Sequence, residues 1–118
     1  MTVRGLRGAI TVPANDAAAI RAATRELLVA LVDANGIVPD DVASVIFTVT
    51  PDLDADYPAR AARDLGWHDV ALLGATELAV PGGLPRCIRV LLHWNTTKSP
   101  HDLKHIYLGL AARLRPDR

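Results

Sequence analysis

The sequence predicts an α+β fold: one domain over residues 1–118, in which about five strands pack on one long helix accompanied by short helices. Three observations support this prediction. A length of 118 residues suits one domain. A hydrophobic fraction of 50% is enough to build a core. Several short β-rich runs accompany only one extended amphipathic helical pattern, so strands should outnumber long helices.

The first half of the chain is predicted as a strand, the long helix and a second strand. Residues 3–12 are rich in β-forming side chains. Asp16 can cap a helix that Asn35 and Gly36 end, and residues 44–50, SVIFTVT, form the clearest strand pattern. The helix keeps one largely apolar face, made of Ile20, Thr24, Leu27, Leu28 and Leu31. That face should cover one side of a sheet.

The second half of the chain is predicted to complete the sheet. A short helix begins near Pro58, and residues 69–73 and 87–94 have the composition of strands separated by a turn-forming loop. A helical turn then starts at Ser99, and residues 106–108 form a last strand.

The balance of helix and strand predicts self-association. Residues 87–94 are apolar at almost every position, the pattern of a strand that is buried on both faces. One long helix can cover only one face of the sheet, so another copy of the chain is needed to cover the second face. We therefore expect an obligate homo-oligomer with pockets at the seams between subunits.

Charge and composition exclude several classes of partner. Thirteen basic and thirteen acidic residues give no net charge, and no basic tract occurs, so neither nucleic acid nor an anionic membrane surface is an expected partner. No apolar run approaches the roughly 20 residues that cross a bilayer. The single cysteine, Cys87, excludes an internal disulfide. We expect a cytoplasmic protein.

The most informative residue is Arg89, which lies in the middle of an apolar strand pattern. An arginine cannot lose its charge on burial, so it needs either a protein carboxylate or the anion of a ligand. Arg7 occupies a similar position in RGLRGAITV, residues 4–12. The two arginines suggest a pocket for a small molecule that is rich in carboxylates, although each could instead form a structural salt bridge with an aspartate.

Common catalytic groups find no support in the sequence. His101 and His105 have a spacing that can hold a metal, but no third ligand lies nearby in the sequence, and two surface histidines are expected. Cys87 lies in an apolar strand, where an inert buried thiol is expected. The only serines, Ser44 and Ser99, lie at a strand start and a helix start, so no catalytic triad is expected.

The side chains that remain can bind and polarise a substrate but cannot attack it. They are Arg7, Arg63, Glu77, Arg89, Tyr107 and Arg115. Few reactions proceed without a nucleophile or a proton transfer, and a unimolecular pericyclic rearrangement is the leading example. Such a reaction needs a catalyst that holds the reactive conformer and places charge where charge develops.

Four segments of the chain resemble the small monofunctional chorismate mutases of the AroH class, in the order and spacing of that family. They are RGLRGAITV, TPDLDADYPARAARDLGW, ELAVPGGLPRCIRVL and HIYLGLAARLRPD. The resemblance implies a mixed five-stranded sheet packed on one long helix, assembled as a homotrimeric pseudo-α/β barrel with active sites at the subunit interfaces. It implies conversion of chorismate to prephenate, on the route to phenylalanine and tyrosine, with no metal or cofactor.

The resemblance also implies roles for individual residues. Arg89 would donate to the ether oxygen of the substrate, and Glu77 would accept from the ring hydroxyl and offset positive charge on the ring. Arg7 and Tyr107 would hold the side-chain carboxylate. The remaining members would close or line the pocket: Tyr57, Arg60 and Arg63 of the short helix, the backbone of Leu73, Gly74, Ala75 and Thr76, and Leu114 and Arg115 near the end of the chain.

Gly74 departs from the family pattern, because family members have a thiol or hydroxyl side chain at this position. The glycine removes a hydrogen bond to the ring hydroxyl, worth about 1 kcal/mol. Activity should survive with weaker binding.

Two other classes of function remain open at this point. A trimer of similar fold could bind carboxylates without catalysis. An imine deaminase of the RidA type also has a trimeric barrel and an interfacial arginine, although it gives Glu77 and Arg89 no joint role.

Overall fold

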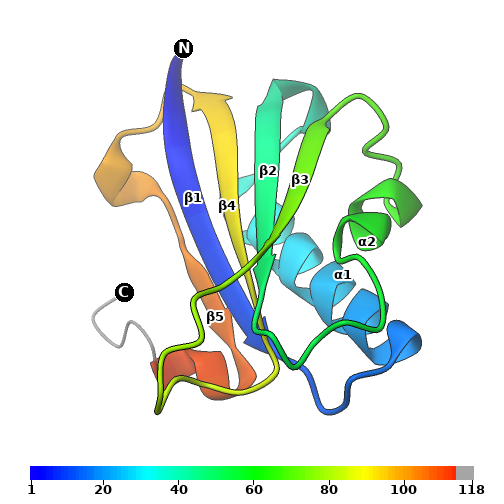
Figure 1. Cartoon of the computed structure of the whole chain (residues 1–118). Helices are drawn as coiled ribbons and strands as arrows, with labels where there is room; N and C mark the ends of the chain where they lie inside the picture. Colours follow the sequence, from blue (N-terminus) through cyan, green and yellow to red (C-terminus); the bar gives the residue numbers. More distant parts are fainter. Residues whose placement is uncertain (114–118) are drawn as a thin grey trace.

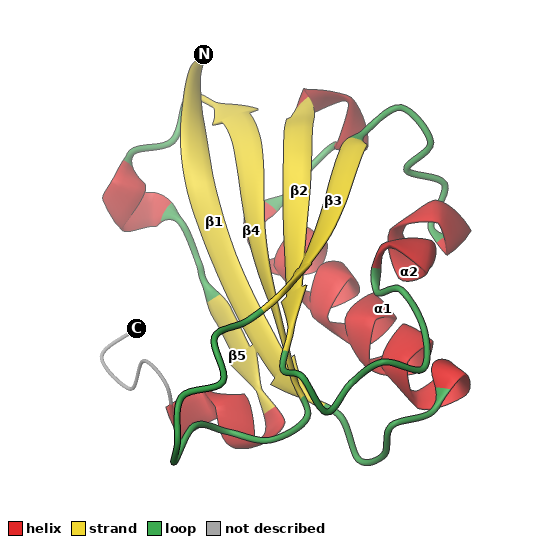
Figure 2. Cartoon of the chain, viewed as in Figure 1, coloured by secondary structure: helices red, strands yellow, loops and turns green. Residues whose placement is uncertain are grey.

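The computed structural model describes residues 1–113, and its centre is a mixed five-stranded sheet (Figures 1 and 2). In chain order the strands are β1 (Thr2–Thr11), β2 (Val42–Val49), β3 (Ala71–Thr76), β4 (Cys87–Thr96) and β5 (Ile106–Leu108). Their order in the sheet is β3-β2-β4-β1-β5. The central strand β4 is antiparallel to β1 and β2, whereas the outer strands β3 and β5 run parallel to their neighbours. The predicted mixed five-stranded sheet is confirmed.

The long helix begins and ends where the sequence signals place it. Helix α1 (Ala17–Asn35) starts at Asp16, whose Oδ1 accepts from the Ala19 N–H at 2.7 Å. It ends at Gly36, which has a φ of 71° and donates its N–H to the Val32 carbonyl. The shorter helices are α2 (Ala59–Asp64) and three 3₁₀ turns at Pro39–Asp41, Pro100–Asp102 and Gly109–Arg113. Within residues 1–113, no helix combines the length and apolarity needed to span a membrane.

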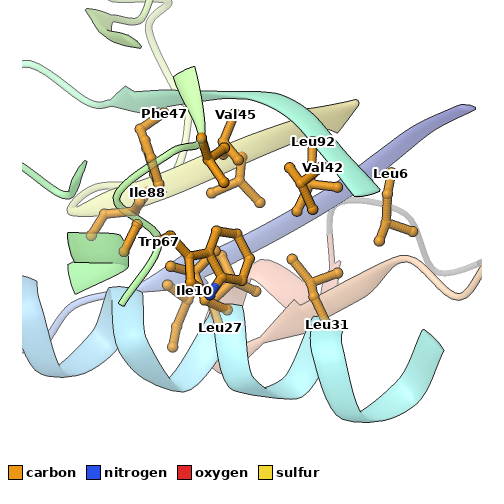
Figure 3. Packing of buried hydrophobic residues seen from close by; sticks show 14 of the residues in the cluster. Leu6, Ile10, Leu27, Leu31, Val42, Val45, Phe47, Trp67, Ile88 and Leu92 are labelled. Carbon is orange, nitrogen blue, oxygen red and sulfur yellow. The ribbon is translucent and has the colours of Figure 1, made fainter. Parts of the chain in front are cut away.

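One face of the sheet is covered by α1 and forms the main core (Figure 3). Leu27, Leu28 and Leu31 of α1 are fully buried, as is Leu92 of β4. Alternate residues of a strand point to opposite faces, so the buried residues Ile88, Val90, Leu92 and Trp94 of β4 all face this core. The helix face predicted for α1 is confirmed, because each of its five residues is buried.

The opposite face of the sheet, called the open face below, points away from α1 and lacks such a cover. Several of its apolar side chains are exposed, with Val3 at 54%, Leu73 at 62% and Leu91 at 36%. The loop of residues 77–86 crosses this side between β3 and β4 (Figure 1), and Leu84 packs there against a small cluster of Ala9, Cys87 and Ala111. In the single chain the open face is therefore only partly covered.

Strand β3 differs most from its predicted limits, since it covers Ala71–Thr76 rather than residues 69–73. Its parallel pairing with β2 runs from Ser44 opposite Ala71 to Val49 opposite Thr76. Glycine, alanine and threonine at its end gave no hydrophobic pattern, and the hydrogen bonds to β2 extend the strand.

Candidate active site

An arginine and a glutamate form an ion pair on the open face. The Arg89 Nε donates to Glu77 Oε1 at 2.9 Å and to Oε2 at 3.1 Å. The Glu77 side chain is 16% exposed and that of Arg89 is 34% exposed. Thr48 of β2 also donates its hydroxyl to Glu77 Oε2 at 2.8 Å. The partner that the sequence required for Arg89 is thus a carboxylate, and it belongs to the other residue predicted to act in catalysis.

The strand registers bring several predicted site residues into one row across the sheet. Ala75 of β3 lies opposite Thr48 of β2, which lies opposite Arg89 of β4. Arg89 lies opposite Ala9 of β1, and Ala9 lies opposite Tyr107 of β5. Residues paired in this way share a face, so all five face the open side. Neighbouring strands lie about 4.8 Å apart, so Arg89 and Tyr107 are about 10 Å apart across β1.

Arg7 also lies on the open face, two residues before Ala9 in β1. The predicted mid-strand position of Arg7 is confirmed, but Arg7 is exposed in the single chain and therefore does not require a buried counter-charge. Its backbone N–H donates to His105 Nδ1 at 2.9 Å. His105 is half-buried, so only His101 of the two histidines fits the surface prediction. No group of three metal-binding side chains occurs within residues 1–113.

Two pockets near β3 each contain some of the predicted site residues, whereas Arg7, Arg63, Leu73 and Tyr107 line neither. The larger, with a volume of about 770 Å³, is lined by Thr48, Glu77 and Arg89 among others. The second, of about 530 Å³, is lined by Tyr57, Arg60, Gly74 and Ala75 among others. Thr76 borders both pockets. Within the single chain, the charged pair and the α2 region therefore line separate pockets.

The residues predicted from the short helix remain apart from the Arg89 pocket. Tyr57 precedes α2 instead of lying in it, and its side chain is 70% exposed. Arg60 pairs with Asp56 at 3.1 Å, and Arg63 is exposed on α2. Leu114 and Arg115, the last predicted members, lie outside the described residues.

Cys87 contributes no nucleophile to this site. It is a free, buried cysteine, and burial raises the pKa of its thiol, which disfavours the reactive thiolate. The inert thiol expected from the sequence agrees with this environment.

Thr48 is a site residue that the sequence analysis missed. Ser44, Thr48 and Thr50 occur at even spacings in β2 and just beyond it, and this period of two was the available signal. Polar residues at three of the four alternate positions from 44 to 50, with Ile46 as the exception, indicate that this face of the strand has a role besides packing.

A mixed sheet that carries a fixed Arg89–Glu77 ion pair on its open face fits the class of isomerases that place charge on a bound substrate. The family model "Chorismate mutase type I" matches residues 3–118. The chain belongs to this family, whose members isomerise chorismate to prephenate.

Individual proteins agree with the family match. The chain is 55% identical to "Chorismate mutase AroH" of Thermus thermophilus over 116 residues, which cover 98% of this chain and 95% of the relative. It is 39% identical to "Chorismate mutase AroH" of Bacillus subtilis (strain 168) over 118 residues, covering 99% and 93%. A solved chorismate mutase from Clostridium thermocellum superposes with a TM-score of 0.92 at 49% identity, covering 93% of this chain and 98% of that one. These matches support neither the imine deaminase nor the non-catalytic trimer.

Proposed function

We propose that this chorismate mutase converts chorismate to prephenate at the Arg89–Glu77 pair on its open face, in a site that a second subunit completes. The cross-strand row from Ala75 to Tyr107 is the observation that supports this most directly. It aligns a cation and a phenol, with a carboxylate beside the cation, on the sheet face that α1 does not cover. The reaction needs no nucleophile from the protein, in agreement with the chemistry of these groups.

Arg89 would stabilise the transition state by donating to the ether oxygen. That oxygen gains negative charge as its bond to the ring stretches, so a fixed cation stabilises the transition state more than the ground state. Only the Nε of Arg89 contacts Glu77. Within residues 1–113 the terminal nitrogens of the guanidinium form no hydrogen bond, which leaves them to donate to a substrate.

Glu77 would have two roles. It orients Arg89 through the ion pair, and it would accept a hydrogen bond from the ring hydroxyl while offsetting positive charge on the ring. The Thr48 hydroxyl and the Glu77 backbone N–H, which donates to Val49 O at 2.8 Å, both hold the glutamate against β2. A carboxylate fixed in this way needs little reorganisation during the reaction.

Arg7 and Tyr107 would bind the side-chain carboxylate of the substrate. An arginine can grip a carboxylate with two parallel hydrogen bonds, and a phenol can add a third. Arg7 is exposed on the open face, and Tyr107 is half-buried at the end of the row. Both are positioned to receive an anion from the open side.

A neighbouring subunit would supply the rest of the site. The open face exposes Leu73 and Leu91, apolar area that a second copy would bury in a homotrimer. Tyr57, Arg60 and Arg63 lie beyond the edge strand β3 in their own subunit, so they could approach the Arg89 pocket of a neighbour. The backbone of Leu73, Gly74, Ala75 and Thr76, with Leu114 and Arg115, would line and close the pocket.

The site so described requires no metal or cofactor, since Arg89 supplies the positive charge. The one cysteine is a buried thiol, which suits a reducing compartment, and we place the enzyme in the cytoplasm.

Complementation between subunits tests both the activity and the shared site. Arg89→Ala and Arg63→Ala subunits should each lose chorismate turnover, measured by the loss of chorismate absorbance. When they are unfolded together and refolded as mixed trimers, some seams would combine an intact Arg89 with an intact Arg63, and activity should return above the mean of the parents. A mixture that matches that mean, with mixed trimers verified by mass, would place both arginines in one subunit's pocket.

A further inference from the structure

The loop of residues 77–86 ends at Arg86 in an unusual backbone conformation. Arg86, the residue before β4, has a φ of 46°, in the left-handed region that non-glycine residues rarely adopt. It is the one non-glycine residue with a positive φ within residues 1–113. Asp52 accepts hydrogen bonds from the Arg86 backbone N–H, with Oδ1 at 3.1 Å and Oδ2 at 2.9 Å. A carboxylate on the turn after β2 thus holds a strained residue in a distant loop.

Further hydrogen bonds tie this point to two strands. The Thr50 hydroxyl donates to Asp52 Oδ1 at 2.5 Å and accepts from the Cys87 N–H at 3.0 Å. At the end of β1, the Val12 N–H donates to Arg86 O at 2.7 Å, and the Arg86 Nε donates to Val12 O at 3.0 Å. Arg86 is therefore fixed against the ends of both β1 and β2.

The conformation at Arg86 determines how the chain enters β4. Cys87 is the first residue of β4 and Arg89 the third, so both point to the open face. A slip of one residue would turn Arg89 toward α1 and away from Glu77. The first residue of the loop, Glu77, is hydrogen-bonded to Thr48 and Val49 of β2, so both ends of the loop are fixed to the end of β2. The end of β2 thus sets the positions of both members of the ion pair.

We propose that Asp52 is a positioning residue for the rearrangement, which holds Arg86 in its left-handed conformation and so keeps Arg89 and Glu77 in their mutual geometry. This inference rests on the proposed function for its catalytic consequence. Asp52 also lines the 770 Å³ pocket, so a direct contact with substrate is the competing explanation. The two explanations differ in whether a backbone change at residue 86 can replace the carboxylate.

A double-variant experiment separates them. Glycine adopts a positive φ without strain, so Arg86→Gly should make the left-handed conformation stable without Asp52. Arg86→Ala is the matched control, because it also loses the Nε contact with Val12 but keeps the strain. Asp52→Ala is measured alone and combined with each change. The measurements are kcat and KM for chorismate and hydrogen exchange at the Cys87 amide, which Thr50 protects.

We expect Asp52→Ala to lower kcat/KM by about 10- to 100-fold, mainly through kcat, as a small misplacement of catalytic groups does. Exchange at the Cys87 amide should accelerate. Asp52→Ala/Arg86→Gly should recover most of the activity and amide protection, and Asp52→Ala/Arg86→Ala should recover neither.

Equal activity of the two double variants, or wild-type kcat/KM in Asp52→Ala, would overturn the proposal. If Asp52→Ala does not fold, Asp52→Asn takes its place in all three variants, since it removes the charge and one acceptor oxygen while keeping the shape. If the wild-type enzyme does not convert chorismate, the proposed function fails, whereas the exchange comparison still decides whether Asp52 holds Arg86.

Discussion

The two faces of the sheet are built from alternate residues of the same strands, yet they differ in burial and in charge. Toward α1, Leu6, Val45, Ile88 and Leu92 are fully buried. Toward the open side, Arg7 and Leu91 are exposed, and Arg89 forms a partly exposed ion pair with Glu77. The face toward α1 is buried within the single chain, whereas the open face combines exposed apolar area with fixed charges.

This difference shows how a small chain can separate folding from function. Burial of apolar side chains against α1 supplies the hydrophobic stabilisation of the monomer. The open face can then keep charged groups in a fixed geometry, because the opposite side of the same strands packs against α1.

Adjacent leucines of β4 provide the most direct test of the contrast. Leu92→Ala should lower the free energy of unfolding by about 2–5 kcal/mol, because it leaves a cavity in the core. Leu91→Ala should instead weaken association, because Leu91 faces the open side. Urea unfolding at two protein concentrations and sedimentation measure both effects. If Leu91→Ala leaves both the subunit association and its concentration dependence unchanged, the open face is not the interface.

Arg89 should affect chemistry far more than folding. Arg89→Ala should raise the barrier of the chemical step by at least about 3 kcal/mol, the usual size for loss of one transition-state donor. Arg89→Lys should restore little, since a flexible ammonium does not reproduce the planar guanidinium. Single-turnover kinetics measure the barrier, and thermal unfolding provides the stability control. A lysine variant with near-normal turnover would reduce Arg89 to a structural or substrate-attracting role.

A polar side chain at Gly74, in the edge strand β3, should improve substrate binding. A side chain fits there, because an added Cβ meets no atom within 4 Å and Gly74 has no left-handed φ. Gly74→Ser should lower KM about fivefold, the equivalent of a hydrogen bond of about 1 kcal/mol. Gly74→Ala, which adds a carbon without a donor, is the control and should leave KM near the wild-type value. Equal KM values for the serine and alanine variants would contradict the missing hydrogen bond.

Asp52 should make folding stability depend on acid. The Thr50 hydroxyl and the Arg86 N–H lower the pKa of Asp52 in the folded chain. A carboxyl with a lowered pKa stabilises the fold above its unfolded pKa of about 3.9, and this contribution is lost as the pH falls through the folded value. The difference in unfolding free energy between wild type and Asp52→Asn should therefore shrink between about pH 5 and pH 2. A constant difference across this range would show that the carboxylate charge is not involved.

The smallest effects are expected when the pH or the metal content of the assay is changed. Ordinary arginines and carboxylates do not change charge between about pH 6 and 9, so kcat should be nearly constant there. EDTA should leave it unchanged, because Arg89 supplies the charge that a metal would supply. A bell-shaped profile in this range would indicate proton transfer in the rate-limiting step and contradict a pericyclic reaction.

Local signals in the sequence predicted most of the fold. Asp16 and Gly36 fixed the limits of α1, and β5 begins and ends at the predicted residues, Ile106–Leu108. Strand β3 was misplaced because its last residues are small and belong to the strand through pairing with β2 alone. The left-handed Arg86 had no signal, because arginine has no preference for a positive φ.

The candidate site was predicted less completely. A charge among apolar residues showed that Arg89 needed an anion, but only the structure identified Glu77 as its partner and added Thr48. The roles assigned to Arg7, Tyr107 and the α2 region stay predictions, since they depend on a substrate and a neighbouring subunit.

The sequence by itself determined which segments become helix and strand, which face of α1 is buried, and which family the chain resembles, because periodicity, capping residues and motifs are local properties. The tertiary structure decided which residues face one another across the sheet. The row from Ala75 to Tyr107 joins residues of all five strands, and its alignment depends on the register of four strand pairs. The alternation of apolar and polar residues in one strand fixes which face is buried, but it does not by itself specify which residue of a distant strand lies opposite, because shifts by two residues keep the same face buried.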